Sequence, residues 1–108
     1  MVNRTRNLYV IRLDDAVLED SKFRKENPGY EPGKPCVYVG VTSHTPEERF
    51  AQHTRGDKAG KGYVTKYGRY LMKRQYEHRN PVATAEAEDK ERALAESLRR
   101  KGFAVWQR

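Results

Sequence analysis

The sequence predicts an α+β fold: a small antiparallel sheet of about three strands flanked by helices. Residues 8–13 and 36–42 indicate strands, because both runs are rich in β-branched and aromatic side chains and both are bounded by polar segments. Residues 84–102 indicate a helix, because their apolar side chains recur at the helical period. We expect the 108 residues to form one domain, since a chain of this length buries one modest core.

A long polar insert, residues 14–35, separates the two predicted strands. Its first part, 15–26, has helical character, and prolines and glycines follow it. The insert is too long for a simple hairpin loop.

The segment after the second strand carries the signals of a helix start. Thr45 and Glu48 have the spacing of a capping box, and Pro46 falls at the first helical position. These residues predict a helix over 46–54. Arg49 and His53 share one face of it, because they are four positions apart.

The next part of the chain predicts a loop, a helix and a third strand. Residues 56–62 are basic and rich in glycine, as is typical of a loop, and 63–72 have apolar side chains at helical spacing. Residues 75–79 are the candidate third strand before Asn80-Pro81 turns the chain. The helix over 84–102 then ends at Gly102, and 103–106 form a terminal extended segment.

Glu91 stands in the middle of the apolar stripe of the last helix. The apolar members of that stripe are Ala87, Leu94, Ala95 and Leu98. A carboxylate that faces the body of a small domain must be paired, hydrogen-bonded or bound to a metal, since burying it alone costs several kcal/mol or shifts its pKa. Two explanations stay open: a structural arginine partner, or a cation that belongs to phosphate chemistry.

The charge balance indicates a polyanionic partner. Lys and Arg number 22 against 15 acidic residues, which gives a net charge of +7. We expect nucleic acid, with DNA ahead of RNA, and no membrane partner, because no apolar run reaches about 18 residues. The first residues show no apolar signal region, and Cys36 has no second cysteine to pair with, so we expect a cytoplasmic protein. His44 and His78 lack a partner at metal-ligand spacing and are interpreted as structural.

Five positions occur in an order that resembles a known nuclease family. Tyr9 ends the run Asn7-Leu8-Tyr9 in the first strand, and Tyr38-Val39-Gly40 lies in the second. Arg49 and His53 follow in a helix, and Glu91 comes four residues after Ala87 in the last helix. This order resembles the GIY-YIG nuclease domain family, over about residues 8–105, as in a single-domain bacterial-type member. Each motif alone is short, but five in order are more specific.

The chain departs from the family pattern at three points. Asn7 and Leu8 replace the glycine and isoleucine of the first motif, which a strand tolerates. The insert at 14–35 is longer than in compact members, and a late asparagine of several relatives has no counterpart after Glu91. We therefore expect the target to differ from theirs.

The resemblance implies an endonuclease that hydrolyses phosphodiester bonds with Mg²⁺, or Mn²⁺, bound mainly by Glu91. Tyr38 would be the general base, which requires its phenol pKa to be lowered from about 10 by nearby cations. Arg49 would hold the attacking water or a phosphate oxygen. Tyr9 would position Tyr38 or the water, and His53 would hold a phosphate or relay a proton. Tyr9 and Tyr38 should therefore lie side by side, facing Arg49 and Glu91.

A second group of residues predicts contacts to the nucleic-acid backbone, with base stacking by an aromatic ring. Its members are Arg55, Lys58, Lys61, Tyr63 and Lys66. An equal interpretation places Tyr63 and Tyr67 in the core and leaves only the basic side chains in solution.

Two other functions stay open. One is a non-catalytic nucleic-acid-binding module of the same fold, and the other is a protein-interaction module whose basic face meets an acidic partner. A small nuclease domain with no attached reader is also expected to use a targeting partner protein. Its oligomeric state is open, although a dimer would cut both strands of a duplex more easily.

Overall fold

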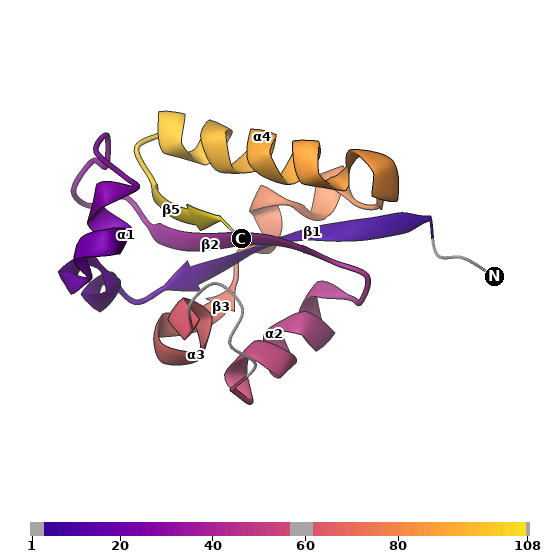
Figure 1. Cartoon of the computed structure of the whole chain (residues 1–108), viewed down its shortest axis with the longest axis horizontal. Coiled ribbons are helices and arrows are strands. Elements are labelled where there is room, and N and C mark those ends of the chain that lie inside the picture. The colour runs from indigo at the N-terminus through magenta and orange to yellow at the C-terminus, as the bar shows by residue number, and fades with distance from the viewer. Residues whose placement is uncertain (1–3, 57–61, 108) are drawn as a thin grey trace.

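The computed structural model describes residues 4–56 and 62–107, and within them five strands form one mixed sheet (Figure 1). The strands are β1 (Thr5–Leu13), β2 (Cys36–Thr42), β3 (Gly68–Leu71), β4 (Val82–Ala83) and β5 (Ala104–Gln107). Their order is β3-β1-β2-β5, and β4 pairs with β1. β5 runs parallel to β2, whereas the other pairs are antiparallel. The fold is α+β, but the prediction of a three-stranded antiparallel sheet is wrong.

The third strand lies earlier than predicted. Residues 75–79 form parts of two 3-10 turns, η3 (Lys73–Gln75) and η4 (Glu77–Arg79), instead of a strand. The predicted helix over 63–72 stops after α3 (Tyr63–Tyr67), and Gly68 begins β3. A Cβ at Gly68 would lie 2.5 Å from the carbonyl oxygen of Val64, so only glycine fits where the chain leaves the helix.

Two other helices form close to where they were predicted. α2 (Pro46–Thr54) has the full capping box, with Thr45 Oγ1 accepting from the Glu48 amide at 3.1 Å. α4 (Ala87–Arg100) follows the turn η5 (Thr84–Glu86), and the chain leaves it through Gly102 at a φ of 91°. Extended chain after Gly102 was predicted, and it forms β5.

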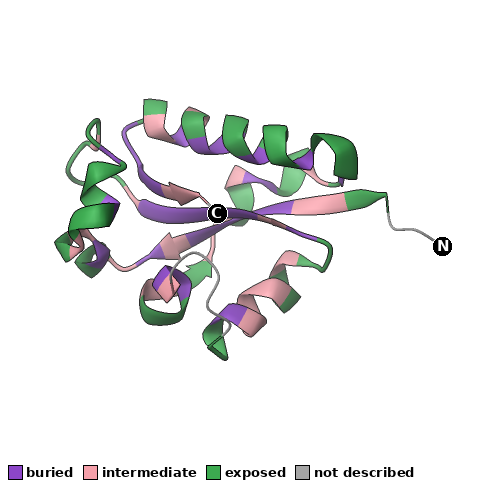
Figure 2. Ribbon diagram, viewed as in Figure 1, coloured by how far each residue is buried: buried purple, intermediate pink, exposed green. Residues whose placement is uncertain are grey.

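The sheet is covered by helices on both faces. In Figure 1, α4 lies along one side of the strands, and α2 and α3 lie along the other side. Figure 2 shows that α4 buries the face turned to the sheet and exposes the opposite face. Within the described residues, no helix combines the length and apolar character that crossing a membrane requires.

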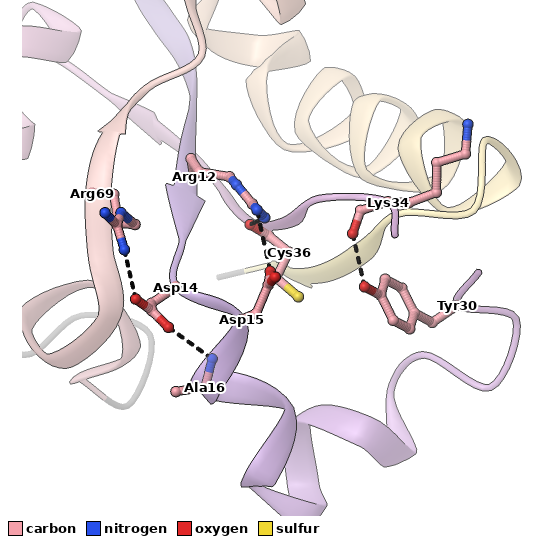
Figure 3. Close-up of polar contacts among 8 residues, drawn as sticks. All are labelled: Arg12, Asp14, Asp15, Ala16, Tyr30, Lys34, Cys36 and Arg69. Carbon is pink, nitrogen blue, oxygen red and sulfur yellow. Dashed lines mark hydrogen bonds and ion pairs between the residues drawn. The ribbon is translucent and has the colours of Figure 1, made fainter. Parts of the chain in front are cut away.

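The polar insert is folded and is tied to β1 and β3. It contains the turn η1 (Asp15–Glu19) and the short helix α1 (Ser21–Lys25). Figure 3 shows Arg69 donating to Asp14 at 2.7 Å, and Arg12 of β1 paired with Asp15 at 3.2 Å. Cys36 is buried at the start of β2, and burial raises the pKa of its thiol to about 11.

Asn27, which follows α1 within the insert, holds β5. Its side-chain carbonyl accepts from the Val105 amide at 2.7 Å, and its side-chain amide donates to the Phe23 carbonyl at 2.9 Å. Arg99 of α4 donates to the Val105 carbonyl at 3.0 Å. The insert therefore fixes the edge strand that completes the sheet next to β2.

Candidate active site

Tyr9, Tyr38 and His53 form one buried aromatic cluster. β1 and β2 pair with Tyr9 opposite Gly40 and Ile11 opposite Tyr38, so the two tyrosines are diagonal neighbours on the same face. Their ring centroids are 6.1 Å apart. The His53 ring reaches them from α2, at 6.0 Å from Tyr9 and 5.4 Å from Tyr38. The expectation that the tyrosines lie side by side is confirmed.

Gly40 gives the Tyr9 ring its place. A Cβ at position 40 would lie 2.5 Å from both Cζ and Oη of Tyr9. Real Cβ atoms do not approach so closely, so the ring can lie over β2 only where that strand has no side chain. The run Tyr38-Val39-Gly40 thus has a steric explanation. Tyr38 supplies one phenol, and Gly40 leaves space for the phenol of Tyr9.

The Tyr9 hydroxyl is held by His53. The distance from Tyr9 Oη to His53 Nε2 is 3.0 Å, and His53 is fully buried. The His53 carbonyl in turn accepts from the Thr65 hydroxyl at 2.8 Å, which ties α2 to α3. This hydrogen bond sets the direction of the Tyr9 phenol within the cluster.

Asn80 holds the strand next to Tyr9. Its side-chain amide donates to the Leu8 carbonyl at 2.8 Å, and its side-chain oxygen accepts from the Leu8 amide at 2.7 Å. One side chain therefore makes the pair of bonds that a neighbouring strand would make. Sequence analysis interpreted Asn80 only as a turn residue.

Arg49 connects the cluster to the surface. It is half-buried on α2, and its Nη1 donates to Gln52 Oε1 at 2.9 Å. Burial raises the pKa of the Tyr9 phenol, while the positive charge of Arg49 and its hydrogen bond to Tyr9 act to lower that pKa. Burial is the larger effect, so Tyr9 is neutral at neutral pH.

Glu91 lies on the buried side of α4, as its place in the apolar stripe predicts. Its side chain is 5% exposed, and Gln107 Nε2 of β5 donates to its Oε1 at 3.2 Å. Its charge also acts on the Tyr9 phenol and raises the pKa of that group. Arg49 and Glu91 therefore both lie close enough to act on the Tyr9 phenol, whereas the convergence of Tyr9, Tyr38, Arg49 and Glu91 in one cleft stays a prediction.

Two adjoining cavities lie beside α4, and the first of them also reaches α2. One has a volume of about 520 Å³ and is lined by residues that include Arg6, His44, Arg49, Gln52, Thr84 and Glu88. The other has a volume of about 410 Å³ and contains Glu91, Arg92 and Gln107. Val41 and Glu88 line both, so the two form one groove, which we name the α2–α4 groove.

The groove passes the end of β2. The described pairing of β5 with β2 stops at Val39 and Gln107, and β2 continues to Thr42. Arg49 and Glu91, which come from opposite sides of the sheet, both reach the groove there. Tyr9, Tyr38 and His53 are at most 1% exposed and do not line the groove, so they form a buried layer next to Arg49.

Of the predicted backbone-binding residues, the structure describes Arg55, Tyr63 and Lys66. Arg55 and Lys66 are exposed, with Lys66 Nζ 5.2 Å from the Tyr67 ring centroid. Lys58 and Lys61 lie outside the described residues.

Tyr63 belongs to the core, which is the second of the two interpretations of this residue. It is 5% exposed, its hydroxyl donates to Asp20 at 3.0 Å, and its ring centroid lies 4.8 Å from that of Trp106. Tyr63 is thus no platform for base stacking, because packing against Trp106 covers the ring.

The donor set around Glu91 fits one kind of metal. Within 4–56 and 62–107, no three His, Cys, Asp or Glu side chains cluster so that they could hold an ion together. Glu91 instead offers one carboxylate at the wall of a groove. That is the arrangement Mg²⁺ accepts, since it keeps several waters and uses one or two carboxylates together with substrate oxygens.

Comparisons of this chain with protein-family models, with curated proteins and with solved structures gave no match. The resemblance to the GIY-YIG nuclease family therefore depends only on the five residues named above and on their order along the sequence.

Arg6, His44 and Gln107 were not predicted as residues of the site, although all three line the groove. Arg6 and Gln107 carried no periodic or motif signal, because their place depends on which strands pair at the two edges of the sheet. His44 was interpreted as structural for want of a metal-ligand partner, yet it lines the groove.

Proposed function

We propose that the protein is a metal-dependent endonuclease that hydrolyses phosphodiester bonds of nucleic acid, with DNA as the first substrate to test. The observation that carries the proposal is that Arg49 and Glu91 line one groove and both act on the Tyr9 phenol, which lies beside Tyr38. The net charge of +7 adds attraction for a polyanion.

The phosphodiester would enter the α2–α4 groove between Arg49 and Glu91. The guanidinium of Arg49, oriented by Gln52, would donate to phosphate oxygens and balance the charge that develops as water attacks phosphorus. Mg²⁺, held by Glu91 and water, would supply a second positive charge to the phosphate when bound. Gln107 orients the Glu91 carboxylate through its hydrogen bond.

Tyr38 is the proposed base. After its phenol has lost a proton to solvent, the Tyr38 phenolate would take one proton from the attacking water while the new P–O bond forms. The bond to the leaving oxygen breaks, and that oxygen takes a proton from solvent. The Tyr38 side chain is fully buried, so this step requires the side chains that cover Tyr38 to move when substrate binds.

Tyr9 and His53 act as positioning residues in this proposal. Both are buried, and their 3.0 Å contact fixes the Tyr9 phenol next to Tyr38. Of the two roles expected for His53, proton relay through Tyr9 has more support than holding a phosphate, because the His53 side chain has no exposed surface.

A non-catalytic nucleic-acid-binding module of the same fold is the second candidate. The complete burial of Tyr38 favours it, since a base must reach water. The two candidates differ at Glu91, because a binder has no use for a carboxylate at the wall of its groove.

The experiment compares cleavage of supercoiled plasmid and of a flapped oligonucleotide with Mg²⁺ or with EDTA. The variant is Glu91→Gln, and Glu96→Gln is the matched control, because Glu96 is an exposed acid on the same helix. Cleavage by the wild type and by Glu96→Gln, lost with EDTA and with Glu91→Gln, would support the nuclease. Equal activity of Glu91→Gln and wild type, or salt-sensitive binding without cleavage of either substrate, would remove the support for metal-dependent catalysis at Glu91.

A further inference from the structure

We propose that the part of the α2–α4 groove between Arg6, His44 and Arg49 binds a second phosphate of the nucleic-acid strand, next to the phosphate that is cut. This inference rests on the proposed function, because it takes nucleic acid as the substrate. It assigns Arg6, which belongs to none of the motifs, to substrate binding.

The pairing of β1 places Arg6 at the groove. β1 pairs with β2 as far as Asn7 and Thr42, and before that point Arg6 pairs with Val82 of β4. The Thr84 amide then donates to the Arg4 carbonyl at 2.8 Å, so the chain passes from β4 directly into the turn before α4. Arg6 therefore lies where the end of β2 and the start of α4 meet.

The backbone at His44 is fixed on both sides. The Asn7 side chain donates to the His44 carbonyl at 3.0 Å, and the His44 amide donates to Thr42 Oγ1 at 3.0 Å. Thr42 itself is 6% exposed. A loop held in this way presents its imidazole at a defined place in the groove.

The chemistry of this part of the groove suits a phosphodiester. Two guanidinium groups, Arg6 and Arg49, and the His44 imidazole line a cavity of about 520 Å³. Guanidinium groups match the oxygens of a phosphate, because their donors form a fixed planar fork. Arg49 is shared with the candidate active site, so a phosphate held between Arg6 and Arg49 would be a near neighbour of the one at Glu91.

One acid opposes this charge. Glu88 is exposed on the first turn of α4 and lines both parts of the groove. Its carboxylate repels a phosphate there, so its removal should strengthen binding. Loss of a positive charge and loss of a negative charge in one groove then give effects of opposite sign, which a general change in folding would not produce.

The first experiment measures binding of a fluorescent oligonucleotide duplex to the full chain in EDTA, over a series of salt concentrations. The variants are Arg6→Gln and Glu88→Gln. Arg79→Gln and Glu96→Gln are their controls, because both residues are exposed and neither lines the groove. Arg6→Gln should weaken binding and reduce the slope of log K against log salt by about 1. Glu88→Gln should tighten binding, and both controls should match the wild type.

The second experiment replaces one phosphate at a time by a neutral methylphosphonate. The wild type should lose affinity when one particular phosphate is neutralised, and Arg6→Gln should be insensitive at that same phosphate, while Arg6→Lys should recover most of the loss. Because binding is measured without metal, an inactive protein that shows this pattern would contradict the nuclease and keep the phosphate site. Equal effects of Arg6→Gln and Arg79→Gln, or no binding by the wild type, would overturn the second phosphate site.

Discussion

Replacing Gly40 by alanine should both destabilise the fold and disable the candidate active site. The added Cβ would lie 2.5 Å from Cζ and Oη of Tyr9 and 2.9 Å from Cε1. Carbon atoms in contact prefer about 3.5–4.0 Å, so the ring must move by about 1 Å. Tyr9 is 1% exposed and lies in the core, so the ring has no free space to enter.

The size of the effect follows from two losses. Overpacking of this kind costs about 1–3 kcal/mol. Moving the Tyr9 hydroxyl away from His53 Nε2 lengthens a buried 3.0 Å contact, which costs about 1–3 kcal/mol more. Alanine in a strand recovers about 0.5–1 kcal/mol relative to glycine. The free energy of unfolding should therefore fall by about 3 kcal/mol, within bounds of about 1–5 kcal/mol, which is a large part of the total for such a domain.

Urea denaturation followed by circular dichroism measures this change. Gly29→Ala is the matched control, because a Cβ at Gly29 meets no atom within 4 Å, and its effect should stay within about 0.5 kcal/mol. In a Tyr9→Leu background the clashing ring atoms are gone, so Gly40→Ala should cost far less there. The steric argument would be refuted if Gly40→Ala had no effect in the wild type, or the same effect in both backgrounds.

Three further predictions concern other parts of the structure. Asn80→Ala removes both hydrogen bonds to Leu8 and should lower the free energy of unfolding in urea by about 2–3 kcal/mol, whereas Asn80→Asp should cost less. Hydrogen bonds from the Phe23 amide and neighbouring groups lower the pKa of Asp20 from 3.8. Asp20→Asn should therefore destabilise the protein above that pH and match the wild type in acid, as unfolding measured over a pH series would show. A difference in stability between the two proteins that stays constant with pH would contradict this. Glu91→Met should leave stability unchanged or raise it by about 1 kcal/mol, because it removes a buried carboxylate; a clear loss of stability would identify a structural ion pair.

Local sequence signals predicted the elements whose causes are local. The capping box at Thr45 fixed the start of α2, and the 3.6-residue period fixed the buried face of α4, with Glu91 on it. The β propensity of the first two strands and the polar segments around them were also sufficient to find them. Because these signals involve neighbouring residues, they do not depend on the rest of the fold.

The predictions of secondary structure and sheet pairing were wrong where contacts between distant residues determine the structure. Gly68 ends α3 because the Val64 carbonyl leaves no space for a Cβ, and the residues after it pair with β1. The apolar spacing of residues 63–72 could not show that the helix ends before Gly68. β5 pairs in parallel with β2, and its place is fixed by Asn27, which is 78 positions from its partner Val105. Contacts between residues so far apart in the sequence cannot be predicted from a local sequence pattern.

The buried polar groups of the described residues separate into two kinds. They are Asn27, Thr42, His53 and Glu91. Asn27 and Thr42 bond to backbone groups, and those bonds account for their burial, because they hold β5 and the turn after β2.

His53 and Glu91 contact side chains from distant elements instead: Tyr9 in one case and Gln107 in the other. These contacts close no turn and complete no sheet, and an apolar residue would fill either place at lower cost in desolvation. A fold usually keeps such groups where a site requires them, which agrees with the roles proposed for His53 and Glu91.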